Sequence, residues 1–151
     1  MRYLLILWGA LVGLPAYGAE PTKMDHITEH LGSEEVAERI TRTDDINQLG
    51  EYFYRLEAFL AEYGQFLRHT SGGRGVERNA HVGGHPASRH LWKYGDADDW
   101  VLKARTRGRM TYLRLSRGAI RHGLTGLVHN VGSGTHLHTQ IPKWERERGE
   151  K

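Results

Sequence analysis

Residues Asp44 to Leu67 read DDINQLGEYFYRLEAFLAEYGQFL, and their apolar pattern sets the fold class. The large apolar residues recur at spacings of three and four, which places them on one face of a helix. We therefore expect a helix from near Asp44 to about Leu67, with Gly64 as its weakest position. Such a helix must bury its stripe against another element. The stripe is Ile46, Leu49, Phe53, Leu56, Phe59, Leu60, Tyr63 and Leu67.

The rest of the chain supplies short strands and further helices. Gly132-Ser133-Gly134 separates two β-prone runs, which predicts a hairpin. Residues 71–84 follow the first expected strand, contain five glycines and are expected to form a loop. The fold class is therefore α+β, with helices packed on a small antiparallel sheet. Expected strands cover 66–70, 98–102, 124–130 and 135–141, and expected helices cover 33–41 and 109–122, the latter ending at Gly123.

The first residues have the pattern of a secretory signal peptide. Met1-Arg2 gives a positive start, Leu4 to Pro15 is apolar and uncharged, and Ala16 to Ala19 offers small residues for cleavage. The apolar run is shorter than the roughly 20 residues that span a bilayer. We expect a periplasmic or secreted protein with no stable membrane anchor after cleavage. The expected divisions are signal peptide 1–19, N-terminal extension with a short helix 20–42, one domain 43–142 and a charged, frayed tail 143–151. Within the extension, residues 20–32 show no clear period and are expected to be extended or loosely packed.

Composition narrows the chemistry. The 151-residue chain has no cysteine, which excludes disulfides and thiolate metal sites. Any metal must be held by carboxylates and by the 10 histidines. The formal net charge is only +3, and the charges look interspersed along the chain, so nothing favours a nucleic-acid partner.

Three of the histidines fall on the expected hairpin. In a strand, residues two apart face the same side, so His136 and His138 project together. A turn at Gly132-Ser133-Gly134 places His129 roughly opposite His136. These imidazoles either form a solvated polar face or bind a metal.

A second group of ligand-type residues lies upstream. His90 precedes the acidic stretch Gly95-Asp96-Ala97-Asp98-Asp99. One loop histidine, one strand carboxylate and one histidine from a neighbouring strand make a three-ligand set, which leaves the fourth tetrahedral position of a catalytic zinc open. The alternative is an Asp-rich turn without metal.

Several motifs follow one another in a family-specific order. Ser71 to Asn79 reads SGGRGVERN, then come Val82-Gly83-Gly84, Ser88-Arg89-His90-Leu91 and the acidic stretch ending at Asp99. This order resembles that of the D-alanyl-D-alanine metallopeptidases, which share a fold with the hedgehog signalling domain and with murein endopeptidases. Residues 123–126, Gly-x-x-Gly before a strand with a histidine, fit the same pattern. The resemblance covers about Thr70 to Ile141.

The resemblance implies roles for individual residues. His90, Asp99 and His138 are its zinc ligands, and Arg74 pairs with a substrate carboxylate or carbonyl oxygen. His90 and Asp99 lie two positions further apart than in the family, so Asp98 is the fallback ligand and a bulge before Gly95 is expected.

The resemblance leaves the base and the third ligand open. Residues 132–135 contain no acidic base, but His136-Leu137-His138 is similar to the His-x-His form of murein endopeptidases. By this resemblance His136 acts in acid–base catalysis beside the metal. His129 is a further histidine that can assist it. Whether His136 or His138 is the third ligand stays open.

The expected function is zinc-dependent hydrolysis of amide bonds in peptidoglycan peptides, as a D-Ala-containing carboxypeptidase or endopeptidase. One alternative is a catalytically inactive, zinc-containing, cell-wall-binding module of the same fold. Another is a histidine-rich protein that buffers metal, which would bind several ions weakly and leave the glycine and arginine motifs without a purpose.

Overall fold

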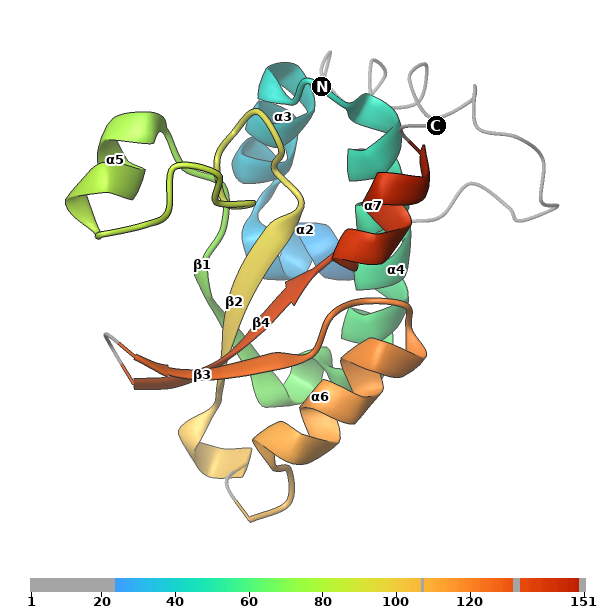
Figure 1. Cartoon of the computed structure of the whole chain (residues 1–151). Coiled ribbons are helices and arrows are strands. Elements are labelled where there is room, and N and C mark those ends of the chain that lie inside the picture. The colour runs from blue at the N-terminus through green and yellow to red at the C-terminus, as the bar shows by residue number, and fades with distance from the viewer. Residues whose placement is uncertain (1–23, 107, 132–133, 150–151) are drawn as a thin grey trace, which may run out of the picture.

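The computed structural model describes residues 24–106, 108–131 and 134–149, so the expected signal peptide lies outside the described residues. Six α-helices and one four-stranded antiparallel sheet make up this part, which confirms the α+β class (Figure 1). The strands lie in the order β1-β2-β4-β3. The helices are α2 (Asp25–Leu31), α3 (Ser33–Arg42), α4 (Ile46–Tyr63), α5 (Val76–His81), α6 (Tyr112–Arg121) and α7 (Lys143–Gly149); the strands are β1 (Leu67–Ser71), β2 (Ala97–Leu102), β3 (Leu127–Val131) and β4 (Gly134–Gln140).

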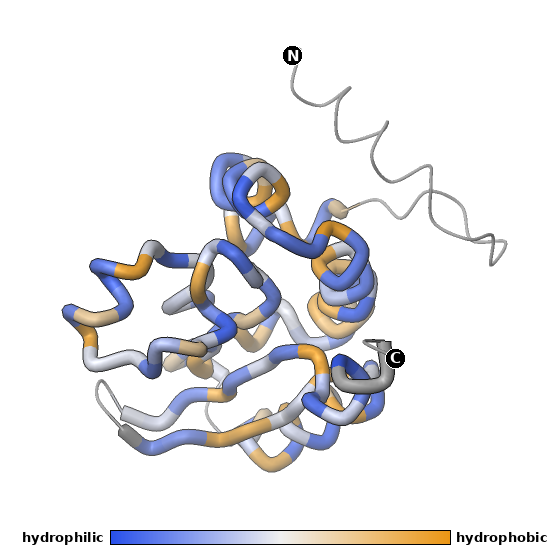
Figure 2. The backbone as a smooth tube through the Cα atoms, turned by 45° about the horizontal axis from the view of Figure 1, so that its top comes forward, coloured by the Kyte–Doolittle hydropathy of each residue, from blue (hydrophilic) through white to orange (hydrophobic). Residues whose placement is uncertain are grey.

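Helix α4 is the long helix expected from the apolar stripe. Its first turn is capped by Asp45, whose carboxylate accepts a hydrogen bond from the Gln48 backbone N–H at 2.9 Å. It ends at Tyr63, and a short 3-10 turn that begins at Gly64 leads into β1, so the helix stops one turn before Leu67. Orange and blue segments alternate along the helices in Figure 2, as expected for elements with one buried face. Ile46 is exposed, however, and Tyr52 takes a fully buried place on the stripe.

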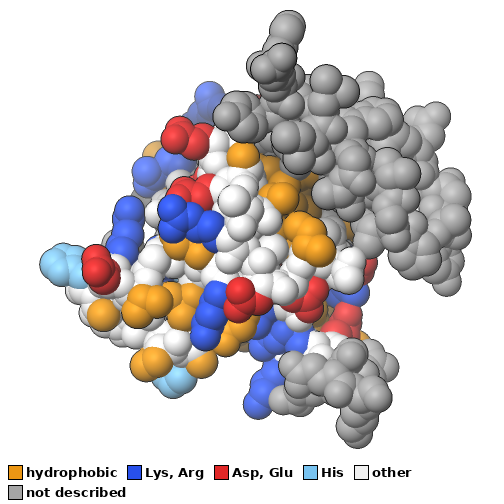
Figure 3. All heavy atoms as spheres, turned by 90° about the horizontal axis from the view of Figure 1, so that it is seen from above, with side chains coloured by type: hydrophobic (Ala, Val, Ile, Leu, Met, Phe, Trp, Pro, Cys, Tyr) orange, Lys and Arg blue, Asp and Glu red, His pale blue; other side chains and the backbone are white. Residues whose placement is uncertain are grey.

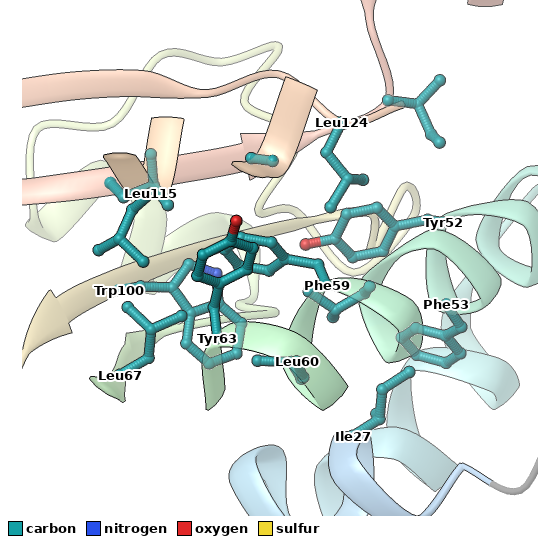
Figure 4. Close-up of a cluster of buried hydrophobic side chains, with 14 of the residues drawn as sticks. Ile27, Tyr52, Phe53, Phe59, Leu60, Tyr63, Leu67, Trp100, Leu115 and Leu124 are labelled. Atoms are coloured by element: carbon teal, nitrogen blue, oxygen red, sulfur yellow. The ribbon is translucent and has the colours of Figure 1, made fainter. Parts of the chain in front are cut away.

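The core lies between α4 and one face of the sheet (Figure 4). Trp100 of β2 is fully buried there, and its indole N–H donates to the Thr139 hydroxyl at 3.0 Å. Leu67 from β1 and Leu115 from α6 close the cluster around it. A buried aromatic ring of this size contributes much of the apolar area that holds such a small core together. Among the described helices, none combines the length and the apolar character needed to cross a membrane.

The register of the sheet places acid and histidine side chains on its other face. Asp99 of β2 pairs with His138 of β4, and His129 of β3 pairs with His136. Because side chains alternate along a strand, Leu137 points into the core while His136 and His138 point away from it. The predicted pairing of His129 with His136 is therefore confirmed.

Helix α2 corrects the expectation that residues 20–32 form an extended or loosely packed start. Residues 25–31 are helical, and Ile27 is fully buried against the core. The first turn of α2 is capped from a distance, because the Glu57 carboxylate on α4 accepts hydrogen bonds from the backbone N–H groups of His26 and Ile27 at 3.1 and 2.9 Å. A cap supplied by another helix leaves no local signal in the sequence.

Helix α3 is tied to the sheet by a buried ion pair. The Arg39 guanidinium donates to both carboxylate oxygens of Asp98, at 2.9 and 2.6 Å, and both side chains are fully buried. Tyr52 donates to the same carboxylate at 2.7 Å, and His69 lies 2.7 Å from it. Burial acts to raise the pKa of Asp98, but Arg39 and His69 outweigh it and hold that pKa far below its ordinary value. The carboxylate is therefore ionised and fully hydrogen-bonded in the core.

Two further expectations were wrong. The glycine-rich residues 71–84 were expected to be loop, but Val76–His81 form helix α5. The C-terminal residues were expected to fray, but Lys143–Gly149 form α7, which is held by an ion pair of 2.6 Å between Arg55 and Glu145. In both cases the helix is too short for its residues to show a repeated apolar spacing.

Removing one partner of the buried ion pair should destabilise the fold strongly. Arg39→Met leaves the Asp98 carboxylate buried without its counter-charge, and breaking a buried pair in this way costs about 3–5 kcal/mol. The free energy of unfolding from urea titrations followed by circular dichroism measures this loss. Arg42→Met is the matched control on the same helix, because its pair with Glu38 is exposed and worth about 0.5 kcal/mol. Equal losses for the two variants would contradict the assignment.

Candidate metal centre

Three of the sequence-predicted ligands meet on the open face of the sheet. His90, Asp99 and His138 each offer one donor atom, and these atoms all lie within 4.8 Å of one another. His138 Nδ1 is 2.9 Å from Asp99 Oδ1 and 3.2 Å from His90 Nε2, and His90 Nε2 is 3.4 Å from Asp99 Oδ2. Two imidazoles and one carboxylate are a common ligand set for zinc. The structure thus brings together a group that can hold a metal ion.

His90 is presented by the loop between α5 and β2. Its Nδ1 lies 3.0 Å from the carbonyl oxygen of Gly72. A carbonyl oxygen only accepts, so Nδ1 carries the proton and the lone pair of Nε2 faces Asp99 and His138. The expected supporting role of Ser88 is seen as well, since its hydroxyl accepts from the His90 backbone N–H at 3.3 Å.

His138 uses its other ring nitrogen. Its Nδ1 faces Asp99 and His90, while its Nε2 lies 3.2 Å from Oε1 of Gln140 on the same strand. With that amide oxygen as acceptor, Nε2 carries the proton of the neutral ring, and the lone pair of Nδ1 faces Asp99 and His90. Gln140 thereby orients His138, a role that sequence reasoning did not assign to it.

Asp99 supplies the negative charge of the group. Burial acts to raise its pKa, but the adjacent His138 and His90 side chains outweigh burial, and the pKa of Asp99 lies far below its ordinary value. For His138, burial acts to lower the pKa and the Asp99 carboxylate raises it, with a raised pKa as the result. Asp98, the fallback ligand, points the other way into the core and is held by Arg39. It takes no part in this group.

His136 lies beside the three ligands. Its Nε2 is 3.8 Å from Asp99 Oδ1, and its Nδ1 lies 3.0 Å from the carbonyl oxygen of Gly134, which leaves a lone pair on Nε2. The His129 ring is centred 5.4 Å from that of His136 and 5.7 Å from that of His138. Burial, together with the nearby histidines, lowers the pKa of His129. The face thus carries two further imidazoles that can move protons.

Arg74 is locked to the same loop. Its backbone N–H donates to the carbonyl of His90 at 2.7 Å, and it forms a β-bridge with Leu91. Its guanidinium donates to Asn79 Oδ1 at 3.0 Å and to Ser71 Oγ at 3.2 Å. Asn79 therefore has a physical task, which is to fix the arginine.

Arg74 also lines a shallow surface pocket. This pocket has a volume of about 190 Å³ and lies beside β1 and the loop that follows it. Ser71, Gly73 and Arg78 contribute to its wall. A small ligand in it can reach the Arg74 guanidinium from solvent.

A second group of potential ligands contains Glu35, His69 and Asp98. Here a cation is already present, because the Arg39 guanidinium donates to Glu35 at 2.6 Å and to both oxygens of Asp98. The arginine fills the position that a metal ion would take. We assign this group to the core and not to a metal site.

Gly72 shows how closely the core network and the ligands approach. A Cβ atom on Gly72 would overlap the Glu35 carboxylate and the Arg39 guanidinium, while its carbonyl holds His90. Any side chain at this position would have to displace the Glu35 carboxylate and the Arg39 guanidinium. This gives a physical reason for the glycine after Ser71.

Sequence reasoning missed the buried partners Arg39, Glu35 and His69. One signal was present, since Arg39 follows Val36 by three positions and so shares its buried helix face. An arginine on an apolar face requires a buried acid, and Asp98 is the residue of the adjacent pair Asp98-Asp99 that faces the core.

Comparisons of the chain with protein-family models, with curated proteins and with solved structures found no match. The resemblance to the D-alanyl-D-alanine metallopeptidases rests on the chain's own motifs.

Zinc titration should reveal one tight site per chain that depends on all three ligands. His90→Ala, Asp99→Ala and His138→Ala each remove one donor, and each should weaken binding by well over the 10–100-fold typical of losing an orienting residue. Isothermal titration calorimetry with ZnCl₂ measures the affinity and stoichiometry. His81→Ala, an exposed histidine on α5, is the control and should bind like the unaltered chain. Tight zinc binding that persists in both His90→Ala and His138→Ala would contradict the assignment of this metal site.

Gln140→Leu tests the orienting role separately. It leaves all three ligands in place but removes the acceptor for His138 Nε2, so zinc affinity should fall by about 10–100-fold. Competition with a chromogenic chelator measures the change. Gln140→Glu, which keeps an acceptor at this position, should retain the affinity, and a loss of the same size in both variants would contradict the role.

Proposed function

We propose that this chain is an exported zinc-dependent peptidase that hydrolyses amide bonds in peptidoglycan peptides, with the fold shared by D-alanyl-D-alanine peptidases and hedgehog domains. One observation carries the proposal: His90, Asp99 and His138 converge on the open sheet face next to His136, and the backbone N–H of Arg74 is bonded to the carbonyl of His90. The α+β architecture and the order of the motifs support it. The apolar start of the chain favours export, and wall peptides lie outside the cytoplasm.

The donor set fits zinc, because both imidazole lone pairs point inward and Asp99 balances part of the ion's charge. A zinc ion held there would supply a Lewis acid for a peptide carbonyl and lower the pKa of an attacking water. We place this ion at the three ligand atoms and assign it no further contact.

His136 is the residue that moves the proton. Its Nδ1 is committed to the carbonyl of Gly134, so its free Nε2 can take the proton of the attacking water and pass it to the leaving amine. In the described part of the chain, Asp99 is the one carboxylate that forms an ion pair with the histidines of this site. An imidazole base is therefore what the site offers.

Arg74 binds the substrate. Its guanidinium is held by Asn79 and Ser71 and borders the pocket, so its outward N–H groups are available to a carboxylate or to the developing oxyanion. Both kinds of target occur in wall peptides, as terminal D-Ala carboxylates and as cross-link carbonyls. A D-Ala-containing or diaminopimelate cross-link is favoured over a free dipeptide.

The absence of an acidic base favours one alternative, a zinc-containing module that binds the wall without cleaving it. Under this alternative the three ligands hold zinc for stability, and Arg74 serves recognition alone.

Digestion of purified peptidoglycan separates the two functions. The zinc-loaded chain should release new amino groups and defined muropeptides, detected by liquid chromatography with mass spectrometry. His136→Gln should bind zinc normally and lose activity by about 10²–10⁴-fold, the usual contribution of a general acid–base group. His81→Gln, at an exposed histidine on α5 away from the site, is the control and should retain the activity. A chain that binds one zinc and wall material but releases no product would be the binding module.

A further inference from the structure

The net positive charge of this chain comes from one segment. Residues 100–144 contain eight Lys and Arg and no Asp or Glu. This corrects the expectation that charges are interspersed, which holds only for the rest of the chain. In Figure 3, which looks from above onto the end that carries α3, acidic and basic side chains lie side by side. Helix α6, from the positive segment, lies at the opposite, lower end in Figure 1.

The exposed face of α6 combines cations with large apolar side chains. Its inner face is buried through Leu115 and Ala119. At about 100° per residue, the outward residues of α6 fall within an arc of roughly 120°. They are Leu113, 59% exposed, Ile120, 60% exposed, and the exposed Arg114, Arg117 and Arg121. Leu113 and Ile120 are seven residues apart and so share one face of the helix, where they lie among these exposed arginines.

The charges around this face are nearly all positive. Arg105 and Arg109, from the segment before α6, are exposed as well. From α4, Glu62 pairs with Arg121 at 2.9 Å and neutralises it. Within the described residues, neither Arg114 nor Arg117 forms an ion pair, and Arg114 donates only to the backbone carbonyl of Arg109 at 3.2 Å. Two unneutralised cations therefore flank the aliphatic pair.

We infer that this face, defined by Leu113, Arg114, Arg117 and Ile120, docks the protein on an anionic phospholipid surface. Arginines pair with lipid phosphates, while aliphatic side chains enter the boundary between headgroups and acyl chains. A polyanion without an apolar phase would use the arginines and leave Leu113 and Ile120 in water. The docked face leaves the metal centre accessible, because α5 and the loop that carries His90 lie at the other end of the sheet (Figure 1). This inference is independent of the proposed function.

Vesicle binding by the full chain tests the docking. The readout is the ratio of partitioning onto vesicles of phosphatidylglycerol and phosphatidylcholine to partitioning onto phosphatidylcholine alone, measured by co-sedimentation at physiological ionic strength. Binding through the apolar start of the chain that does not depend on lipid charge contributes equally to both measurements and cancels in the ratio. Arg114→Gln with Arg117→Gln should lower the ratio by about 30-fold, from about 1 kcal/mol for each arginine near an anionic surface. Arg68→Gln with Lys93→Gln, exposed cations outside α6, should leave it within about 2-fold.

The aliphatic residues distinguish a lipid surface from a soluble polyanion. Leu113→Ser with Ile120→Ser should weaken binding to anionic vesicles by at least 10-fold and leave binding to long-chain polyphosphate unchanged. Because the chain has no cysteine, a fluorophore at Leu113→Cys reports directly on insertion. Its emission should shift to the blue with anionic vesicles, whereas a label at Tyr54→Cys, an exposed position on α4, should not shift.

Two outcomes would overturn the inference. If vesicle binding is unchanged in the Leu113→Ser, Ile120→Ser double variant, and the fluorophore at Leu113→Cys shows no blue shift, the partner is a soluble polyanion. Equal loss from the Arg68, Lys93 control pair would mean that net charge acts without any defined face.

Discussion

The buried contact between Arg39 and Asp98 is the constraint on which the rest of this structure depends. Asp98 and Asp99 are neighbours on β2, and a strand sends neighbouring side chains to opposite faces. Arg39 makes the core the only face that can accept Asp98, since a buried carboxylate requires a fixed counter-charge. Asp99 must then point to the open face. A slip of one residue would turn Asp99 toward the core and send Asp98 and Trp100 to the open face, which would break both the ion pair with Arg39 and the core packing.

The same network reaches the metal group by a second route. Glu35 accepts from Arg39 and also from the backbone N–H of Gly73 at 3.0 Å, and the carbonyl of Gly72 fixes the His90 ring. Helix α3 thus positions the loop histidine as well as the strand carboxylate. Residues assigned to an N-terminal extension by their weak pattern therefore form part of the support of the site. A change in α3 acts on both ligands although it touches neither of them.

The features that could be predicted from the sequence are those set by local periodicity. The stripe of α4, the hairpin and the pairing of His129 with His136 follow from spacings within single segments. Helix α2 could not be predicted, because its cap is Glu57, about thirty residues away, and the apolar spacing of seven residues is too short to read. The three ligands came from a resemblance in motif order. The partners that orient His90 and His138 are Gly72 and Gln140, and they could be identified only from the folded structure. The tautomer of each histidine depends on which acceptor faces its ring, and the sequence does not show this.

The hydrogen bonds around His90, Asp99 and His138 also indicate which charge is favoured between these three side chains. His90 keeps its proton on Nδ1, directed at Gly72, and His138 directs Nε2–H at Gln140. The remaining positions face one another: two ring nitrogens and a carboxylate, at 2.9 to 3.4 Å. Three acceptors at this range repel one another unless a positive charge lies between them. Burial acts to lower the pKa of His138 and the adjacent Asp99 carboxylate raises it, with a raised pKa as the result, so the surroundings of His138 favour positive charge at this place.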